Sequence, residues 1–266
     1  MTLGHHQFLL TAVGTTAGHR RLGAQAHRVP LVVWVGMQVR TLSGGGGDPL
    51  RRPHLVPCTV REVKEFMTSA GPAHVLLERP ERPAFLVMLT HGAGGTPDTA
   101  DILAVRDVAR ELGAATALVT QPYRVRGARA PGSVPKQDAA WVEVVDRVRE
   151  ETEHGGAGLL VVQCGRSNGA RVACRTARHV GAIGVIALAF PLRPPGQPGK
   201  SREAELRGAG TSVLVINGER DPFGVPESDE ATDVVVLPGE AHALSKHPEA
   251  VGVAVKNWLS GLLPLG

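Results

Sequence analysis

Cysteines, long apolar runs and clustered metal ligands are all scarce in this sequence of 266 residues. The cysteines, Cys58, Cys164 and Cys174, are odd in number and have no CxxC spacing, which excludes a disulfide framework. No stretch reaches the roughly 18 consecutive apolar residues that span a bilayer. No His, Cys and Asp cluster has ligand spacing, so we expect no metal and no other cofactor. These absences favour a cytoplasmic protein.

Positive charge is concentrated at the start of the chain. Residues 1–56 contain six arginines and one acid, Asp48, which leaves 23 basic and 24 acidic side chains elsewhere. Phosphate binding needs a clustered basic face, so we expect neither a nucleic-acid nor a membrane partner for the folded part. Residues 1–56 lack a helical or strand period and are predicted to be a poorly ordered or extraneous leader, or else a targeting arm. One folded domain is expected over residues 57–266.

Strands and amphipathic helices alternate from Val60 onward. Val60–Ser69 and His74–Glu78 favour a hairpin, and the apolar run Phe85–Leu89 favours a buried strand that opens into a glycine-rich loop. A helix is expected next, with Thr96 as its cap and Pro97 as its first residue. Further strands are predicted at Ala115–Val119, Leu159–Val162, Ile183–Phe190, Val213–Ile216 and Asp233–Leu237, and further helices at Gln137–Glu150, at Asn168–Arg178 and from Pro248. This alternation predicts an α/β fold with a mostly parallel, doubly wound sheet and helices on both faces.

The strongest local motif is the G-x-S-x-G run Gly165–Gly169, between a predicted buried strand and a predicted helix. A serine on such a tight turn needs glycines two positions away on each side, because a Cβ there would collide with the adjoining strand and helix. The turn exposes the hydroxyl at a helix N-terminus, where the dipole favours negative charge. We therefore predict Ser167 to be a nucleophile.

Chain order supplies candidates for its partners, because an acid after a late strand and a histidine after the last strand complete such a site. Asp221 follows strand Val213–Ile216, and His242 follows strand Asp233–Leu237. His242 would act as the base, and Asp221 would orient it. Glu219 is the competing acid, and His247, beside the start of the last helix, is the competing base.

The run His91–Gly95 follows a buried strand and suits the binding of a developing oxyanion. We assign the donors to the backbone of Ala93, or its neighbour Gly92, and of Asn168. An ordinary tight turn or a phosphate-binding loop is the alternative, but the run lacks a P-loop lysine and G-x-G-x-x-G spacing. The basic segment Arg124–Gly132 emerges at the same sheet edge and is either a solvated surface loop or a receiver for an anionic substrate group.

Five runs of the chain resemble the dienelactone-hydrolase-like branch of the α/β-hydrolases. More narrowly, they resemble the small predicted hydrolases related to subunit three of the NSL chromatin complex. The runs are LTHGAGG (Leu89–Gly95), CGRSNGARVA (Cys164–Ala173), FPLRPPGQPGK (Phe190–Lys200), INGERDPFG (Ile216–Gly224) and GEAHAL (Gly239–Leu244). The resemblance implies an α/β-hydrolase fold, and it assigns the triad positions to Ser167, Asp221 and His242. The short Pro-rich connection after Phe190 also argues against a large lid. Serine replaces the cysteine nucleophile of dienelactone hydrolase, so that enzyme's lactone substrate is not carried over.

These residues and this resemblance are consistent with two alternative functions. The first is a serine hydrolase that cleaves a small ester, thioester or amide through an acyl-enzyme, with a small-molecule substrate as its partner. The second is a non-catalytic binding or scaffold protein with the same fold, as the relative in a chromatin complex suggests. Because a scaffold is free to lose triad residues and none is missing here, the sequence favours the hydrolase. The oligomeric state is left open.

Overall fold

The computed structural model describes residues 59–152, 158–197 and 199–263, so the expected leader at 1–56 lies outside the described residues. The described part of the chain contains eight strands and six helices. In chain order these are β1 (Val60–Thr68), β2 (Gly71–Arg79), β3 (Leu86–Thr90), α1 (Ala100–Glu111), β4 (Ala115–Thr120), α2 (Pro122–Val125), α3 (Val134–Thr152), β5 (Val161–Arg166), α4 (Asn168–Thr176), β6 (Ala182–Leu188), α5 (Glu203–Arg207), β7 (Ser212–Gly218), β8 (Thr232–Leu237) and α6 (Pro248–Leu262).

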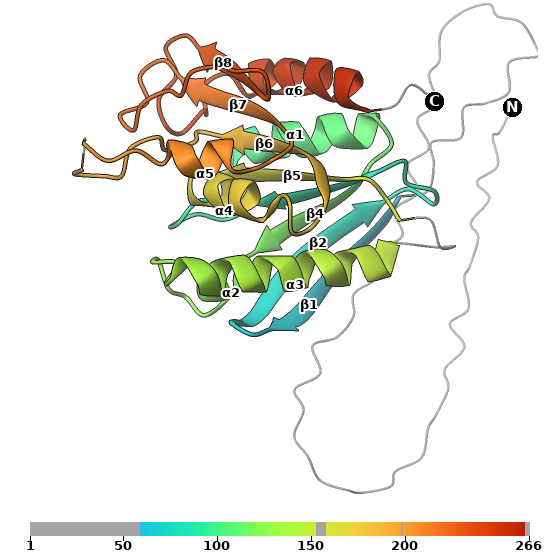
Figure 1. Cartoon of the computed structure of the whole chain (residues 1–266). Helices are drawn as coiled ribbons and strands as arrows, with labels where there is room; N and C mark the ends of the chain where they lie inside the picture. Colours follow the sequence, from blue (N-terminus) through green and yellow to red (C-terminus); the bar gives the residue numbers. More distant parts are fainter. Residues whose placement is uncertain (1–58, 153–157, 198, 264–266) are drawn as a thin grey trace, which may run out of the picture. The chain divides into compact units, whose positions relative to one another are not determined.

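The eight strands form one sheet in the order β1-β2-β4-β3-β5-β6-β7-β8 (Figure 1). β1 and β2 form the predicted antiparallel hairpin, and β2 pairs antiparallel with β4. The remaining neighbours, from β4 to β8, pair in parallel. The carboxyl ends of these parallel strands therefore meet at one edge of the sheet, where ligands bind in open α/β folds.

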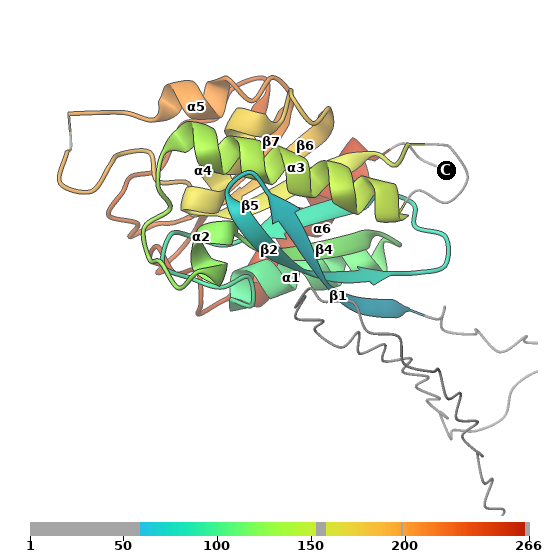
Figure 2. The same ribbon diagram turned by 90° about the horizontal axis from the view of Figure 1, so that it is seen from below.

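Helices cover both faces of this sheet (Figures 1 and 2). α1 packs against α6 on one face, and α3 packs against α4 on the other. Phe85, Ile102 and Val255 belong to the apolar core beneath α1 and α6, whereas Trp141 and Val145 belong to the core beneath α3. This arrangement confirms the predicted α/β-hydrolase fold, and the described chain carries no large lid between β6 and β7.

Several predicted element ends differ from the structure by up to four residues, among them the start of α1 and the end of β5. α1 begins at Ala100, with Thr99 as its N-cap residue. The hydroxyl of Thr96 donates to the carboxylate of Asp98 and does not cap this helix. β5 runs on to Arg166 although its apolar run stops at Val162. Its next residue, Gln163, is fully buried and accepts hydrogen bonds from Trp141 Nε1 and Thr176 Oγ1, so a polar residue continues a buried strand.

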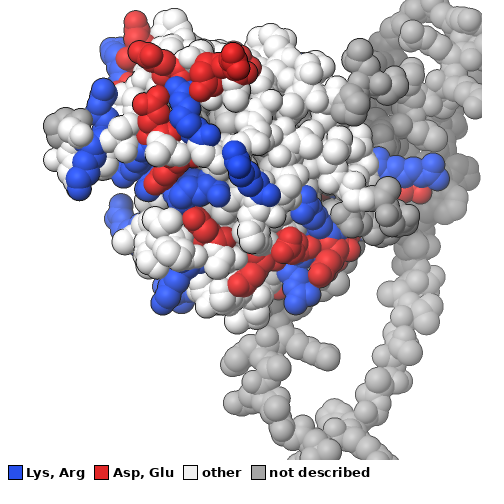
Figure 3. Space-filling model, in the orientation of Figure 1, with Lys and Arg blue, Asp and Glu red and all other residues white. Residues whose placement is uncertain are grey.

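The surface over α3, α4 and α5 carries interleaved charges of both signs (Figure 3). Arg171 and Arg175 both bind Glu205, and Arg175 also binds Asp138 through two nitrogens. The positive charges of Arg171 and Arg175 are therefore paired. Among the described helices, none combines the length and apolar character needed to cross a membrane.

Candidate active site

Ser167 lies alone between the end of β5 and the start of α4, with φ of 52° and ψ of −110°. A left-handed φ is strained for a residue with a side chain, and such strain is typical of functional turns. A Cβ on Gly165 would lie 2.2 Å from the backbone carbonyl of Gly169, and a Cβ on Gly169 would lie 2.7 Å from the His91 oxygen. Both glycines are therefore required for the turn that presents the serine.

A continuous chain of hydrogen bonds joins Ser167, His242 and Asp221. His242 Nε2 lies 2.9 Å from Ser167 Oγ, and His242 Nδ1 lies 2.8 Å from Asp221 Oδ2. A carboxylate only accepts hydrogen bonds, so Nδ1 donates to it and Nε2 of the neutral ring accepts from the serine hydroxyl. The Asp221 side chain is fully buried, and its other oxygen accepts from the amide of Phe223 at 2.9 Å.

The two competing residues lie elsewhere. Glu219 is exposed, and its carboxylate accepts from the amide of Gly239 at 2.8 Å, in the turn after β8. His247 precedes α6 as its N-cap residue, and its Nδ1 lies 3.2 Å from the carboxylate of Glu249. The structure thus brings Asp221 and His242, not Glu219 and His247, to Ser167.

Arg166 ties the backbone around His242 to the body of the domain. Its Nη2 donates to the carbonyl oxygen of His242 at 2.9 Å, and its Nε donates to Asp101 Oδ2 at 3.1 Å. The Asp101 side chain is fully buried at the start of α1. Burial raises the pKa of this carboxyl, and the charge of Arg166 opposes that rise. Sequence reasoning missed this pair, because nothing local marks partners 65 residues apart.

Two further residues shape the loop that carries His242. Glu240 is almost fully buried, and its Oε1 accepts from the amides of Lys246 and His247, each at 2.7 Å. Phe223 packs edge-on against the imidazole of His242, with ring centroids 4.6 Å apart. Glu240 lies in the run GEAHAL and Phe223 in the run INGERDPFG, but the sequence alone indicated no role for either.

The loop after β3 lies against the serine turn. Gly92 is buried, and a Cβ on it would lie 3.3 Å from the Cβ of Ser167. Within the described chain, the amide of Ala93 donates to no backbone carbonyl. Asn168 is the first residue of α4, so its N–H has no acceptor inside the helix. The N–H groups of Ala93 and Asn168 therefore have no backbone acceptor among the described residues and are available as donors near Ser167.

His91 fixes the shape of this loop. Its Nδ1 lies 2.8 Å from the carbonyl oxygen of Gly92, and its Nε2 accepts from the amide of Gln121 at 3.0 Å. This pattern requires the neutral tautomer with the proton on Nδ1. Burial lowers the pKa of His91 from its ordinary 6.5, which favours that neutral form.

The described cysteines are not candidates for the nucleophile. Cys164 and Cys174 are completely buried, as expected for small core residues. Burial raises the pKa of Cys164 well above its ordinary value and that of Cys174 to about 12. Across the described ranges, no group of three or more His, Cys, Asp and Glu residues is arranged to hold a metal ion.

The sheet and the serine turn together define the α/β-hydrolase class. Residues 83–243 match the family model described as an α/β hydrolase domain, and the chain belongs to that family. No curated protein matches the chain.

Solved structures with this fold come from several bacteria. XC6422 from Xanthomonas campestris, described as an α/β serine hydrolase without a lid, is 18% identical over 77% of this chain and 96% of its own, with a TM-score of 0.57. Est1E from Butyrivibrio proteoclasticus, with ferulic acid bound, is 18% identical over 75% and 98%, with a TM-score of 0.58. Dienelactone hydrolase from Anabaena variabilis is 20% identical over 75% and 98%, with a TM-score of 0.57. At these identities the likeness concerns the fold.

Proposed function

We propose that this protein is a serine hydrolase that cleaves a small carboxylic ester, thioester or amide through an acyl-enzyme. The observation that carries the proposal is the unbroken hydrogen-bond chain from Asp221 through His242 to Ser167 Oγ. The comparisons support it through fold neighbours that are esterases or serine hydrolases. Ser167 is the nucleophile, His242 the general base and Asp221 the orienting acid.

In the first half of the reaction, Ser167 Oγ attacks the substrate carbonyl carbon while His242 Nε2 takes the hydroxyl proton. His242 then returns this proton to the leaving group as the bond to it breaks, which leaves the acyl group on Ser167. In the second half, water attacks the acyl carbon with the same help from His242 and releases the acid. Asp221 holds the ring and stabilises the imidazolium in both halves.

The negative charge on the substrate oxygen is stabilised by the backbone N–H groups of Ala93, or its neighbour Gly92, and of Asn168. Each such donor contributes about 3–4 kcal/mol to the transition state in a preorganised site. His91 supports this arrangement indirectly, because it holds the carbonyl of Gly92 turned toward its own Nδ1. Gly92 contributes a surface without a side chain, which lets the loop approach Ser167 closely.

The direct test is labelling of the purified protein with a fluorophosphonate probe, which reacts with activated serines. We expect wild type to label, Ser167→Ala to lose labelling, and His242→Ala to label at a sharply lower rate. His247→Ala and Glu219→Ala serve as matched controls and should label like wild type, because neither side chain contacts Ser167 or His242.

Circular dichroism of each variant separates loss of the site from loss of the fold. A folded wild type that does not label would contradict the catalytic proposal and leave the non-catalytic scaffold as the better explanation.

The narrower kinship with hydrolases related to subunit three of the NSL complex is also a proposal, supported by the run Phe190–Lys200.

A further inference from the structure

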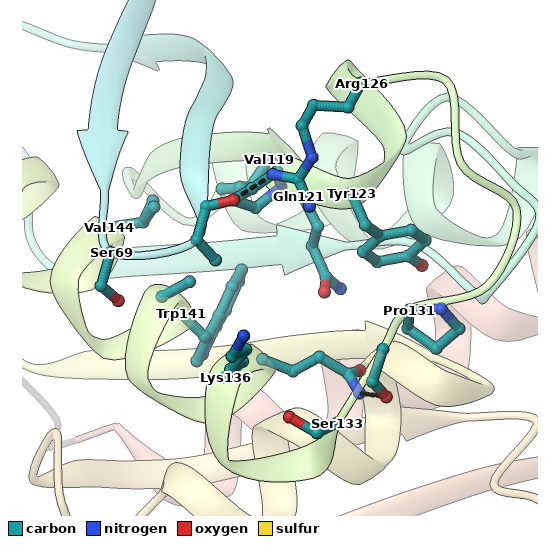
Figure 4. Close-up of a pocket in the computed structure, with 15 residues that line it drawn as sticks. Ser69, Val119, Gln121, Tyr123, Arg126, Pro131, Ser133, Lys136, Trp141 and Val144 are labelled. Carbon is teal, nitrogen blue, oxygen red and sulfur yellow. Dashed lines mark hydrogen bonds between the residues drawn. The ribbon is translucent and has the colours of Figure 1, made fainter.

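A cavity of about 510 Å³ lies beside the oxyanion loop, between the end of β4, α2 and α3 (Figure 4). Its volume is in the range of about 300–1,000 Å³ that is usual for small-molecule sites. Apolar side chains form most of its wall, including those of Val119, Tyr123, Trp141 and Val144. Burial raises the pKa of Tyr123 to about 12, so its hydroxyl remains protonated.

The side chains that line the cavity carry two positive charges, and the Glu143 carboxylate lies outside the lining, where it accepts from the amide of Ser69 at 2.6 Å. The 15 lining residues include Arg126 and Lys136 but no aspartate or glutamate. Lys136 forms no ion pair within the described ranges, and Arg126 donates to the backbone oxygen of Ala70 rather than to a carboxylate. Figure 4 shows Arg126 reaching the cavity from the α2 side and Lys136 from the α3 side. This combination of apolar wall and unpaired cations suits an apolar chain that ends in an anion.

Two lining residues connect the cavity to the reacting centre. Gln137 accepts a hydrogen bond from Asn168 Nδ2 at 2.8 Å, and the Tyr123 hydroxyl lies 3.4 Å from the carbonyl oxygen of Gly92. Gly92 and Asn168 flank Ser167. Neither Ser167 nor His242 lines the cavity, and the side chains of Gln137 and Tyr123 stand between it and the groups assigned to the oxyanion.

The order of the strands indicates which half of a substrate would face this cavity. β4 lies on one side of β5, whereas β7 and β8, which lead to Asp221 and His242, lie on the other. In the mechanism above, the leaving group must lie beside His242 Nε2 to receive its proton. The acyl half then extends away from His242, toward β4.

We propose that this cavity binds the acyl half of the substrate and that Arg126 and Lys136 pair with a carboxylate at its far end. The inference rests on the proposed hydrolase function and narrows its substrate class to esters or thioesters of acyl groups with a terminal carboxylate. The apolar wall holds the carbon chain, and the two cations select the anion.

The test compares two esters, 4-nitrophenyl hexanoate and mono(4-nitrophenyl) adipate, in which a carboxylate replaces the terminal methyl group. Spontaneous hydrolysis is subtracted with Ser167→Ala. We expect wild type to have the higher kcat/KM for the adipate ester. Lys136→Gln should lower the adipate-to-hexanoate ratio about tenfold, mainly through KM, since a uniform binding contact is lost. Arg126→Gln should act in the same direction, and added salt should reduce the preference.

Arg129→Gln is the matched control, because it removes one positive charge from the same loop at an exposed residue that does not line the cavity. Its ratio should equal that of wild type. Ser167-dependent hydrolysis of the hexanoate ester without any preference for adipate would overturn this inference and leave the hydrolase function standing. In 4-acetoxybenzoate the carboxylate is on the leaving group. If the enzyme prefers this ester to an uncharged aryl acetate and Lys136→Gln removes that preference, the assignment to the acyl half is overturned. If the folded protein is neither labelled by the probe nor able to hydrolyse these esters, both proposals are overturned.

Discussion

Two segments meet at Ser167, and they are held in place by different forces. The serine turn, Gly165–Gly169, is fixed by close packing, because a methyl group on either glycine would overlap backbone atoms. The loop Glu240–His247 is fixed by hydrogen bonds instead. The buried Glu240 carboxylate accepts from two amides of the same loop, and Arg166, which lies outside the loop, donates to the carbonyl oxygen of His242. The position of Ser167 therefore depends on the absence of side-chain atoms, and the position of His242 depends on charged groups taken out of water.

The difference determines how each segment responds to substitution. A steric overlap with backbone atoms costs much free energy to relieve, because the whole strand-to-helix turn must shift. A lost hydrogen bond leaves the fold in place but leaves its buried partner unsatisfied. Changes in the turn should therefore reduce stability most, and changes around the His242 loop should separate stability from reactivity.

Gly165→Ala should produce the largest effect. The new Cβ would lie 2.2 Å from the carbonyl carbon and oxygen of Gly169. We expect the free energy of unfolding to fall by more than about 4 kcal/mol, the range reached by severe steric mutations. Chemical denaturation monitored by circular dichroism measures this loss, and the soluble fraction on expression should fall with it.

Gly261→Ala is the control for the same change in a helix. Gly261 lies near the end of α6, and nothing lies within 4 Å of the position that its Cβ would occupy. Adding a methyl group there should be neutral or stabilising by up to about 1 kcal/mol. Equal destabilisation by the two variants would show that close packing is not what distinguishes the serine turn.

Arg166→Gln should have the second largest effect. It removes the partner of a fully buried carboxylate, Asp101, and the donor to the His242 carbonyl oxygen. We expect a loss of about 3 kcal/mol in the free energy of unfolding, because the remaining charge is left unpaired. The rate of fluorophosphonate labelling should fall as well, since His242 loses a backbone restraint.

The double variant Arg166→Gln with Asp101→Asn separates these two consequences. Removing the buried charge should restore part of the stability, whereas the labelling rate should remain low because the bond to His242 is still missing. Arg147→Gln, which breaks an exposed pair with Glu150, should cost at most about 0.5 kcal/mol. Full recovery of labelling in the double variant would mean that Arg166 acts on stability alone.

The same contrast explains how far the sequence could predict the molecule. The fold was accessible because buried strands and amphipathic helices leave periodic patterns, and the serine turn because its glycines lie within five residues. Asp221 and His242 followed from their order after two late strands. Arg166 and Asp101 gave no such signal, since their partnership depends on how β5 and α1 pack. The cavity is likewise formed by segments brought together only in the folded chain.

His91 should give the smallest effect, and this effect depends on pH. Its imidazole accepts from the Gln121 amide and is held neutral by burial, so its pKa in the folded protein lies below 6.5. At a pH between the pKa of His91 in the folded protein and its pKa of about 6.5 in the unfolded chain, His91 binds a proton only in the unfolded chain. Stability contributed by the neutral ring is therefore complete above pH 6.5 and decreases as the pH falls, by up to about 1.4 kcal/mol per pH unit.

His91→Gln removes this titration, so its free energy of unfolding should depend less on pH between 7.5 and 5.5 than that of wild type, in urea titrations at each pH. The glutamine variant should also be less stable at pH 7.5, because it does not reproduce both bonds of the ring. His179→Gln, at an exposed residue, should keep the wild-type slope. If the His91 variant keeps that slope too, the loop beside Ser167 is held by close packing alone, like the serine turn itself, and protonation of His91 does not weaken it.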